Sequence, residues 1–241
     1  MREIDKKLYN AKTVEEAQNL IEQGADVRAK DKFGLTPLCY VQNADVAKVL
    51  IDAGAEIHTK YKYGCTLLHY VKDVDIARVL VNAGADVNVK NEYGGTPLHT
   101  VRSAEIAKIL IEAGADIYAK GISMFCGTPL NYAKNGEIAK VLIEAGADVN
   151  MQDADGRVPL HYVQNMEVAK VLICAGADVN VQDNFRATPL HYARDVEIAK
   201  VLVENGARID AKDEDGETAL EYAKNNGRYD VANFIENYQA G

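Results

Sequence analysis

Apolar and polar positions recur along this chain with a period of about 30 residues. The clearest marker is a glycine followed by alanine and, in most copies, aspartate. It stands at Gly24, Gly54, Gly84, Gly114, Gly146, Gly176 and Gly206, at intervals of 30 residues except for one of 32. A fixed period of this length predicts a stack of similar supersecondary units, each too small to bury its own apolar face. Function is therefore expected on a surface that repeats.

Each period predicts two helices. In the second unit Thr36 is suited to an N-cap and Pro37 to the first helical position, and Leu38 and Val41 then form the apolar stripe of a short first helix. Val46, Val49, Leu50 and Ala53 have the i, i+3, i+4, i+7 spacing of a second helix. Ala47 and Ile51 widen the apolar face of this helix. Gly54 then ends that helix, because a C′ residue commonly needs a positive φ. A helix that is apolar over most of its surface is expected to lie between neighbours.

The segments Thr96-Pro-Leu-His99 and Thr188-Pro-Leu-His191 resemble the signature of the ankyrin repeat family. The resemblance extends over essentially the full chain. It implies an all-α solenoid of helix-turn-helix units joined by β-hairpin-like loops, with N- and C-terminal caps. One departure is systematic: residues 162–166 stand where the family usually has three more, so the first helix or its connection must be shorter. Only the last unit, at 223–231, keeps the full length.

These boundaries predict a single ankyrin-repeat domain over residues 1–241. It consists of an N-cap at 1–30, full repeats at 31–60, 61–90, 91–120, 121–152, 153–182 and 183–212, and a C-cap at 213–241. Polar residues at apolar positions, such as Glu16 and Asn19 at one end and Glu221 and Asn233 at the other, are typical of capping repeats. The two caps lead us to expect a complete protein that is a monomer.

Composition narrows the class of protein. No segment approaches the roughly 18 apolar residues of a membrane span, and the four cysteines lack paired spacing, which favours reduced thiols. We expect a cytoplasmic protein without membrane contact, although delivery into a host cell is compatible with the sequence. The net charge of −9 argues against nucleic acid as a partner.

The charge is uneven along the chain. Residues 1–120 hold 16 Lys and Arg against 17 Asp and Glu, whereas residues 121–241 hold 11 against 19. A lysine precedes each loop of the first half, at Lys30, Lys60, Lys90 and Lys120, and stacking would align these side chains as a ladder. The ladder is interpreted either as a solubilising edge or as the region that meets an acidic partner.

Catalysis is not expected. Four histidines, His69, His99, His161 and His191, share one position in the repeat, so neighbours lie about one helix diameter, roughly 10 Å, apart. A zinc ion needs its ligands at about 2.0–2.1 Å and cannot collect two of them by simple stacking. The resemblance implies that they bond backbone in the hairpin region instead. We expect no metal and no cofactor.

Positions that vary between units are the candidates for binding another protein. The resemblance places the partner-binding surface at the loop tips, at the position two after each tip aromatic, and at the exposed end of the first helix. Candidate contacts are Phe33, Leu35, Tyr63, Tyr93, Ile122, Met124, Phe125, Arg157, Phe185 and Arg186. Exposed aromatics are favoured interface anchors. The alternative is that each ring only covers its own hairpin.

The loop at 121–127 is two residues longer than its counterparts and carries Ile122, Met124 and Phe125 where other loops carry charge. Insertions in repeat proteins often lie on the binding face, so we interpret this loop as a bulge that contacts the partner. Cys126 stands where other loops have a glycine, so the local backbone is expected to change. Arg186 also replaces a loop glycine, and a smaller change of the backbone is expected there.

Two further residue types recur at fixed positions of the repeat. Tyrosines recur after the histidine position, at Tyr40, Tyr70, Tyr132, Tyr162, Tyr192 and Tyr222, and are interpreted as packing residues whose hydroxyls reach solvent. Asn88, Asn150 and Asn180 resemble the asparagines that are hydroxylated in ankyrin repeats.

The function predicted is that of a noncatalytic protein-protein interaction module, such as a host-directed ankyrin effector. The alternative is an intracellular adaptor or immunity-type inhibitor that acts on a partner from the same cell.

Overall fold

The computed structural model describes residues 1–122 and 126–240, and their contacts divide into two compact units, Met1–Ala115 and Asp116–Gly241. The first unit contains α1 (Glu3–Leu8), α2 (Val14–Glu22), η1 (Pro37–Tyr40), α3 (Ala44–Asp52), η2 (Lys62–Gly64), η3 (Leu67–His69), α4 (Val74–Asn82), α5 (Pro97–Thr100) and α6 (Ala104–Glu112). The second contains η5 (Pro129–Tyr132), α7 (Gly136–Glu144), η6 (Pro159–Tyr162), α8 (Met166–Cys174), η7 (Pro189–Tyr192), α9 (Val196–Glu204), α10 (Ala219–Asn225) and α11 (Tyr229–Ala240). The expected all-helical solenoid is confirmed.

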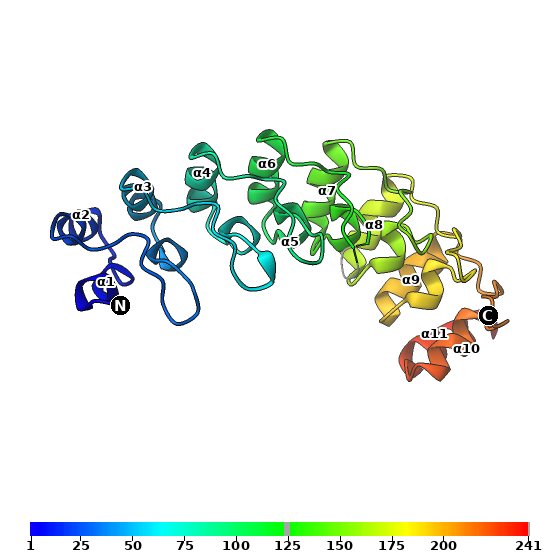
Figure 1. Ribbon diagram of the computed structural model, residues 1–241. Coiled ribbons are helices and arrows are strands. Elements are labelled where there is room, and N and C mark those ends of the chain that lie inside the picture. Colours follow the sequence, from blue (N-terminus) through cyan, green and yellow to red (C-terminus); the bar gives the residue numbers. More distant parts are fainter. Residues whose placement is uncertain (123–125, 241) are drawn as a thin grey trace. The chain divides into compact units, whose positions relative to one another are not determined.

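Within each unit the longer helices pack side by side. In the first unit α2 contacts α3, α3 contacts α4 and α4 contacts α6, and in the second α7, α8, α9 and α11 follow in the same way (Figure 1). Each of these helices buries a few apolar side chains; in α3 they are Val46, Ala47 and Leu50. Val49 is only half-buried and Ala53 is exposed, so the apolar stripe that packs is narrower than the sequence pattern predicts.

The ends of the longer helices follow the sequence closely. The Asn43 side chain accepts hydrogen bonds from the backbone N–H groups of Asp45 and Val46, at 2.8 and 3.3 Å, and so caps the N-terminus of α3. At the other end Gly54 has a φ of 92°, which a residue with a Cβ adopts only with strain. Equivalent polar caps and positive-φ glycines bound α4, α6, α7, α8 and α9.

The first helix of most units is a single 3₁₀ turn of three or four residues rather than an α-helix. In η6 the backbone turns to an extended conformation at Val163, directly after Tyr162, and only three residues separate η6 from α8. The last unit, which has the full sequence length, forms the seven-residue helix α10. The missing residues therefore shorten the first helix, as predicted.

The threonine at the start of each short turn does not cap it in the expected way. Thr36 and Thr96 occupy the N-cap position, but their hydroxyls accept no bond from the backbone of the turn. The Thr96 hydroxyl lies 2.9 Å from Nδ1 of His99 instead. Threonine caps of the usual kind are formed by Thr218 at the longer α10 and by Thr13 at α2. In the turn of Thr96 a histidine side chain is the partner of the threonine hydroxyl, and in the turn of Thr36 the partner is Sγ of Cys39.

A side chain four residues after most glycine markers donates a hydrogen bond to the carbonyl of the next marker. The bonds run from Arg28 to Gly54 (2.8 Å), Asn88 to Gly114 (2.9 Å), Tyr118 to Gly146 (2.5 Å), Asn150 to Gly176 (3.2 Å) and Asn180 to Gly206 (2.9 Å). The three asparagines that resemble hydroxylation sites therefore hold consecutive repeats together. Their hydroxylation stays a prediction.

Candidate functional site

Most hairpin tips are organised by one acidic or amide side chain at their start, although the tip of Tyr63 begins with Tyr61 instead. The Asp31 carboxylate oxygen Oδ1 accepts hydrogen bonds from the backbone N–H groups of Phe33 and Leu35, at 2.8 and 2.9 Å. Equivalent pairs of bonds are accepted by Asn91, Asp153, Asp183 and Asp213. Because these bonds fix the backbone of the tip, they also fix where the tip side chain emerges.

The tips of the first unit present aromatic rings to solvent. The side chain of Phe33 is 69% exposed and that of Tyr63 is 43% exposed. Tyr93 is half-buried, and its ring centroid lies 5.8 Å from that of Tyr63. A ring that served only to cover its own hairpin would be largely buried. The exposure of Phe33 favours the anchor interpretation for that residue, whereas Tyr93 combines packing with partial exposure.

Lysine side chains lie over the two exposed rings. Nζ of Lys32 is 4.9 Å from the centroid of Phe33, and Nζ of Lys62 is 4.7 Å from that of Tyr63. At these distances a cation is attracted to the ring face. Lys32 and Lys62 belong to the loop tips that the sequence interpretation placed on the binding surface, but they were not among its candidate contacts. The signal was present, since a lysine precedes the aromatic in both tips.

The remaining candidates fall in different surroundings. Leu35 is half-buried, and Phe185 and Ile122 are 41% and 65% exposed. Met124 and Phe125 lie outside the described residues, so their role in the bulge stays a prediction. Within its loop Cys126 is half-buried, with its Sγ 3.6 Å from a carboxylate oxygen of Asp153.

Arg186 does not change the backbone of its loop, which corrects the sequence expectation. Its φ is 60°, the left-handed region that glycine adopts in the equivalent tips. Asp183 still accepts bonds from Phe185 and Ala187, both at 3.0 Å. The tip contacts therefore hold a non-glycine residue in a conformation that costs about 1–2 kcal/mol. The side chain of Arg186 is exposed.

The hydroxyls of three of the recurring tyrosines bond to carboxylates instead of only reaching solvent, which corrects a second expectation for them. The Tyr40 hydroxyl donates to Asp31 at 2.6 Å, and this bond raises the pKa of Tyr40 to about 12. Tyr162 donates to Asp153 and Tyr192 to Asp183 in the same way. The fixed spacing of nine residues between each aspartate and its tyrosine was a signal that the sequence interpretation missed.

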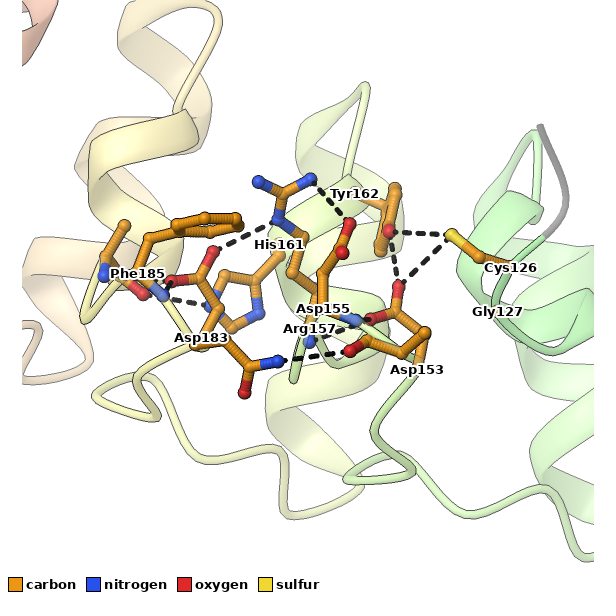
Figure 2. Close-up of polar contacts among 12 residues, drawn as sticks. Cys126, Gly127, Asp153, Asp155, Arg157, His161, Tyr162, Asp183 and Phe185 are labelled. Atoms are coloured by element: carbon orange, nitrogen blue, oxygen red, sulfur yellow. Dashed lines mark hydrogen bonds and ion pairs between the residues drawn. The ribbon is translucent and has the colours of Figure 1, made fainter. Parts of the chain in front are cut away.

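Arg157 is held in the second unit by a set of polar contacts (Figure 2). Its Nε donates to a carboxylate oxygen of Asp183 at 3.0 Å, its Nη2 donates to the Tyr192 hydroxyl at 2.9 Å, and its Nη1 lies 3.5 Å from Asp155. Its guanidinium carbon is 5.7 Å from the ring centroid of Phe185. Burial alone would lower the pKa of Arg157, but the bonds to Asp183 and Tyr192 raise it. Arg157 is thus a rigid, half-buried cation that positions the Phe185 ring.

Models of ankyrin repeats, each three copies long, match residues 8–91, 41–121, 123–183 and 162–240. The chain belongs to the ankyrin repeat family. Ankyrin repeats are protein–protein interaction modules, and their fold is typically a noncatalytic scaffold. The chain is also similar in fold to the crystal structure of the ankyrin repeat domain of Bcl-3, a unique member of the IkappaB protein family. The TM-score is 0.66, the identity is 23%, and the match covers 84% of this chain and 98% of that one. A search of curated proteins gives no match.

The histidines of the ankyrin repeats bond to backbone groups. Nδ1 of His69 accepts the N–H of Thr66 at 3.1 Å, so Nε2 carries the proton and donates to the Gly95 carbonyl, also at 3.1 Å. His161 and His191 make the same links to Ala187 and Glu217. Burial lowers the pKa of all three. Each neutral imidazole therefore joins the start of its own turn to the next hairpin, and no three metal-ligand side chains gather in residues 1–122 and 126–240.

The lysine ladder also links repeats. Nζ of Lys60 donates to the carbonyl of Lys90 at 3.4 Å in the first unit, and Nζ of Lys120 donates to that of Gln152 at 2.7 Å in the second. In the described part of the chain no helix combines the length and apolar character that crossing a bilayer requires.

Asn131 occupies the histidine position of its repeat and offers a test of that role. Its Oδ1 accepts the N–H and the hydroxyl of Thr128, both at 2.9 Å, but its buried Nδ2 has no hydrogen-bond partner. We expect Asn131→His to raise the free energy of unfolding by about 0.5–1.5 kcal/mol, because the imidazole reaches the next hairpin. Urea unfolding measures the change. The reciprocal variant, His161→Asn, is expected to lose a similar amount. An Asn131→His variant no more stable than the wild type would contradict the proposed link.

Proposed function

We propose that this chain is a noncatalytic module that binds another protein through its hairpin tips and the adjoining ends of the short first turns. The observation that carries the proposal is the exposure of large rings at successive tips, with Phe33 69% exposed and Tyr63 43% exposed. Their backbones are held by hydrogen bonds within and between hairpins, such as the bond from Glu92 N–H to the Tyr63 carbonyl at 2.9 Å. A rigid aromatic anchor loses little entropy on binding, which is why such residues dominate interfaces.

The second unit supports the same proposal with different chemistry. Arg157 and Phe185 form a cation–ring pair that is fixed by Asp183, and Arg186 projects from the neighbouring position of the same tip. Arginine and aromatic side chains are the types most enriched at binding hot spots. We propose that both units present binding residues, that the protein is a monomer, and that the loop at 121–127 adds contacts.

Site-specific photo-crosslinking tests where a partner binds. A benzoylphenylalanine is placed at Phe33 or Phe185 in the tips, and in matched controls at the exposed Lys48 of α3 or Lys170 of α8. We expect the tip positions to capture a common partner and the helix positions to capture none. Equal capture from the helix positions would contradict the proposed surface. Capture from a host lysate alone indicates an effector, and capture from the source cells alone indicates an adaptor or inhibitor.

The contribution of the rings is a separate prediction. We expect the triple variant Phe33→Ala, Tyr63→Ala, Tyr93→Ala to lose at least about 2 kcal/mol of binding free energy, roughly thirtyfold in Kd. Its melting temperature should stay within a few degrees of the wild type. Calorimetric titration with the captured partner measures the change, and Tyr229→Ala, which removes a ring 66% exposed on α11, is the control. Unchanged binding together with a large fall in stability would identify the rings as hairpin packing.

A further inference from the structure

The hairpins of the first unit differ in charge from those of the second. Residues 29–36, 59–66 and 89–96 contain five lysines and two acidic residues, whereas residues 151–158, 181–188 and 211–218 contain seven acidic residues and three basic ones. The positive charge of the first unit accompanies its exposed rings. We name as the basic aromatic edge Lys30, Lys32, Phe33, Lys60, Lys62 and Tyr63.

The acidic residue inside this edge forms hydrogen bonds within its own hairpin. The Asp31 carboxylate accepts a bond of 2.6 Å from the Tyr40 hydroxyl and two bonds from backbone N–H groups of its own tip. Both oxygens of this carboxylate therefore accept hydrogen bonds from the hairpin and the short turn that follows it. The exposed ammonium groups of Lys32 and Lys62 lie over the neighbouring rings, so each tip offers an apolar surface and a positive charge together.

We propose that the basic aromatic edge binds an extended acidic segment of the protein partner. This inference rests on the proposed function and adds the chemistry of what the first unit recognises. Charge complementarity is the argument: carboxylates would meet Lys32 and Lys62, and the hydrophobic side chains between them would lie on Phe33 and Tyr63.

The spacing of the repeats predicts a spacing in the partner. Adjacent hairpins are separated by about one helix diameter, roughly 10 Å, and an extended chain in the polyproline II conformation advances about 3.1 Å per residue with three residues per turn, so side chains three residues apart share one face. A segment that crosses the tips therefore passes one repeat for every three residues. Acidic side chains at every third position would meet Lys32 and Lys62 in turn, and likewise Lys30 and Lys60.

Single-stranded nucleic acid is the other occupant that lysines and rings could bind, through phosphates and stacked bases. The peptide is favoured because the whole chain carries a net charge of −9 and the basic aromatic edge contributes only four lysines. Binding to nucleic acid gains most of its affinity from neutralising many phosphates, which such an edge does not do. The test therefore includes an oligonucleotide.

A dodecapeptide phage library is selected on the full-length protein, and the enriched peptides are synthesised with a fluorescent label. We expect them to be acidic, with Asp or Glu three residues apart, and to bind more weakly as salt is raised. The double variant Lys32→Glu, Lys62→Glu should lose at least tenfold in affinity. The control Lys48→Glu, Arg78→Glu makes the same charge change on the exposed faces of α3 and α4 and should bind within twofold of the wild type.

Three results would overturn the inference: no enriched peptides, peptides without an acidic excess, or equal losses in the two double variants. Tighter binding of a labelled single-stranded dodecanucleotide than of the selected peptides would also overturn it, in favour of a nucleic acid. Circular dichroism of both variants establishes that they are folded. Photo-crosslinking at Phe185 reports on the second unit independently of the peptide test. If Phe185 captures a partner while the peptide test fails, the proposed function stands and only the inference of an acidic partner segment is overturned.

Discussion

Removal of residues 213–241 is expected to make the remaining chain self-associate. These residues form α10 and α11, which pack against η7 and α9 and bury Val231, Ala232 and Ile235. Burial of Val231 and Ile235 contributes about 1.5–3 kcal/mol each, and the truncation loses both while exposing the apolar face of α9. An exposed apolar face in a repeat protein is a site of association between molecules.

Polar contacts make the same truncation costly. Nη1 of Arg228 donates to the carbonyls of His191 and Ala193, at 3.2 and 3.1 Å, and the N–H of Glu214 donates to the Phe185 carbonyl at 2.8 Å. Light scattering with thermal unfolding measures the outcome. A control that removes only residues 237–241, whose described side chains are exposed, should remain like the full chain. A monomeric 1–212 fragment that melts at the wild-type temperature would contradict the capping role.

His69→Ala is expected to lower the free energy of unfolding by about 1–3 kcal/mol at pH 7, the cost of leaving buried backbone groups of Thr66 and Gly95 without partners. The side chain of His69 is 4% exposed. His58→Ala is the control, because His58 lies exposed in a loop, and it should change stability by less than about 0.5 kcal/mol. Neither variant should respond to added zinc or chelator. A melting temperature of the wild type that falls with chelator would contradict a purely structural role.

The loss in His69→Ala is also expected to shrink as pH falls. Burial is the main reason that the pKa of His69 lies below its usual value, so the folded protein holds the imidazole neutral. Below the unfolded pKa of about 6.5 the unfolded chain binds a proton that the folded chain does not, so the stability that His69 provides is present above that pH and is lost as pH falls toward the folded pKa. Urea unfolding between pH 7 and pH 5 measures the difference between wild type and variant. A difference that grows toward pH 5 would contradict a neutral buried histidine.

The sequence was sufficient for the architecture because the signals are local and are repeated. A polar N-cap such as Asn43, an apolar stripe such as Val46 and Leu50, and a glycine such as Gly54 act within one helix, and each copy reinforces the others. The shortened first turn followed from the number of residues between two signals. Exposure of Phe33 and Tyr63 at the tips could also be predicted from the sequence, because a turn carries its central side chains outward.

Contacts between neighbouring repeats were decided only by the tertiary structure. Arg157 meets Asp183 across 26 residues, and the Tyr192 hydroxyl completes that set, because the separation and rotation of successive hairpins bring these groups together. Arg186 keeps a glycine-like φ of 60° because the surrounding bonds outweigh its local preference. The repeat period thus determined which residues share a row. The side-chain rotamers and the packing of one repeat on the next determined which of these residues are held within the protein. The same factors determined which residues, such as Phe33, remain exposed to meet a partner.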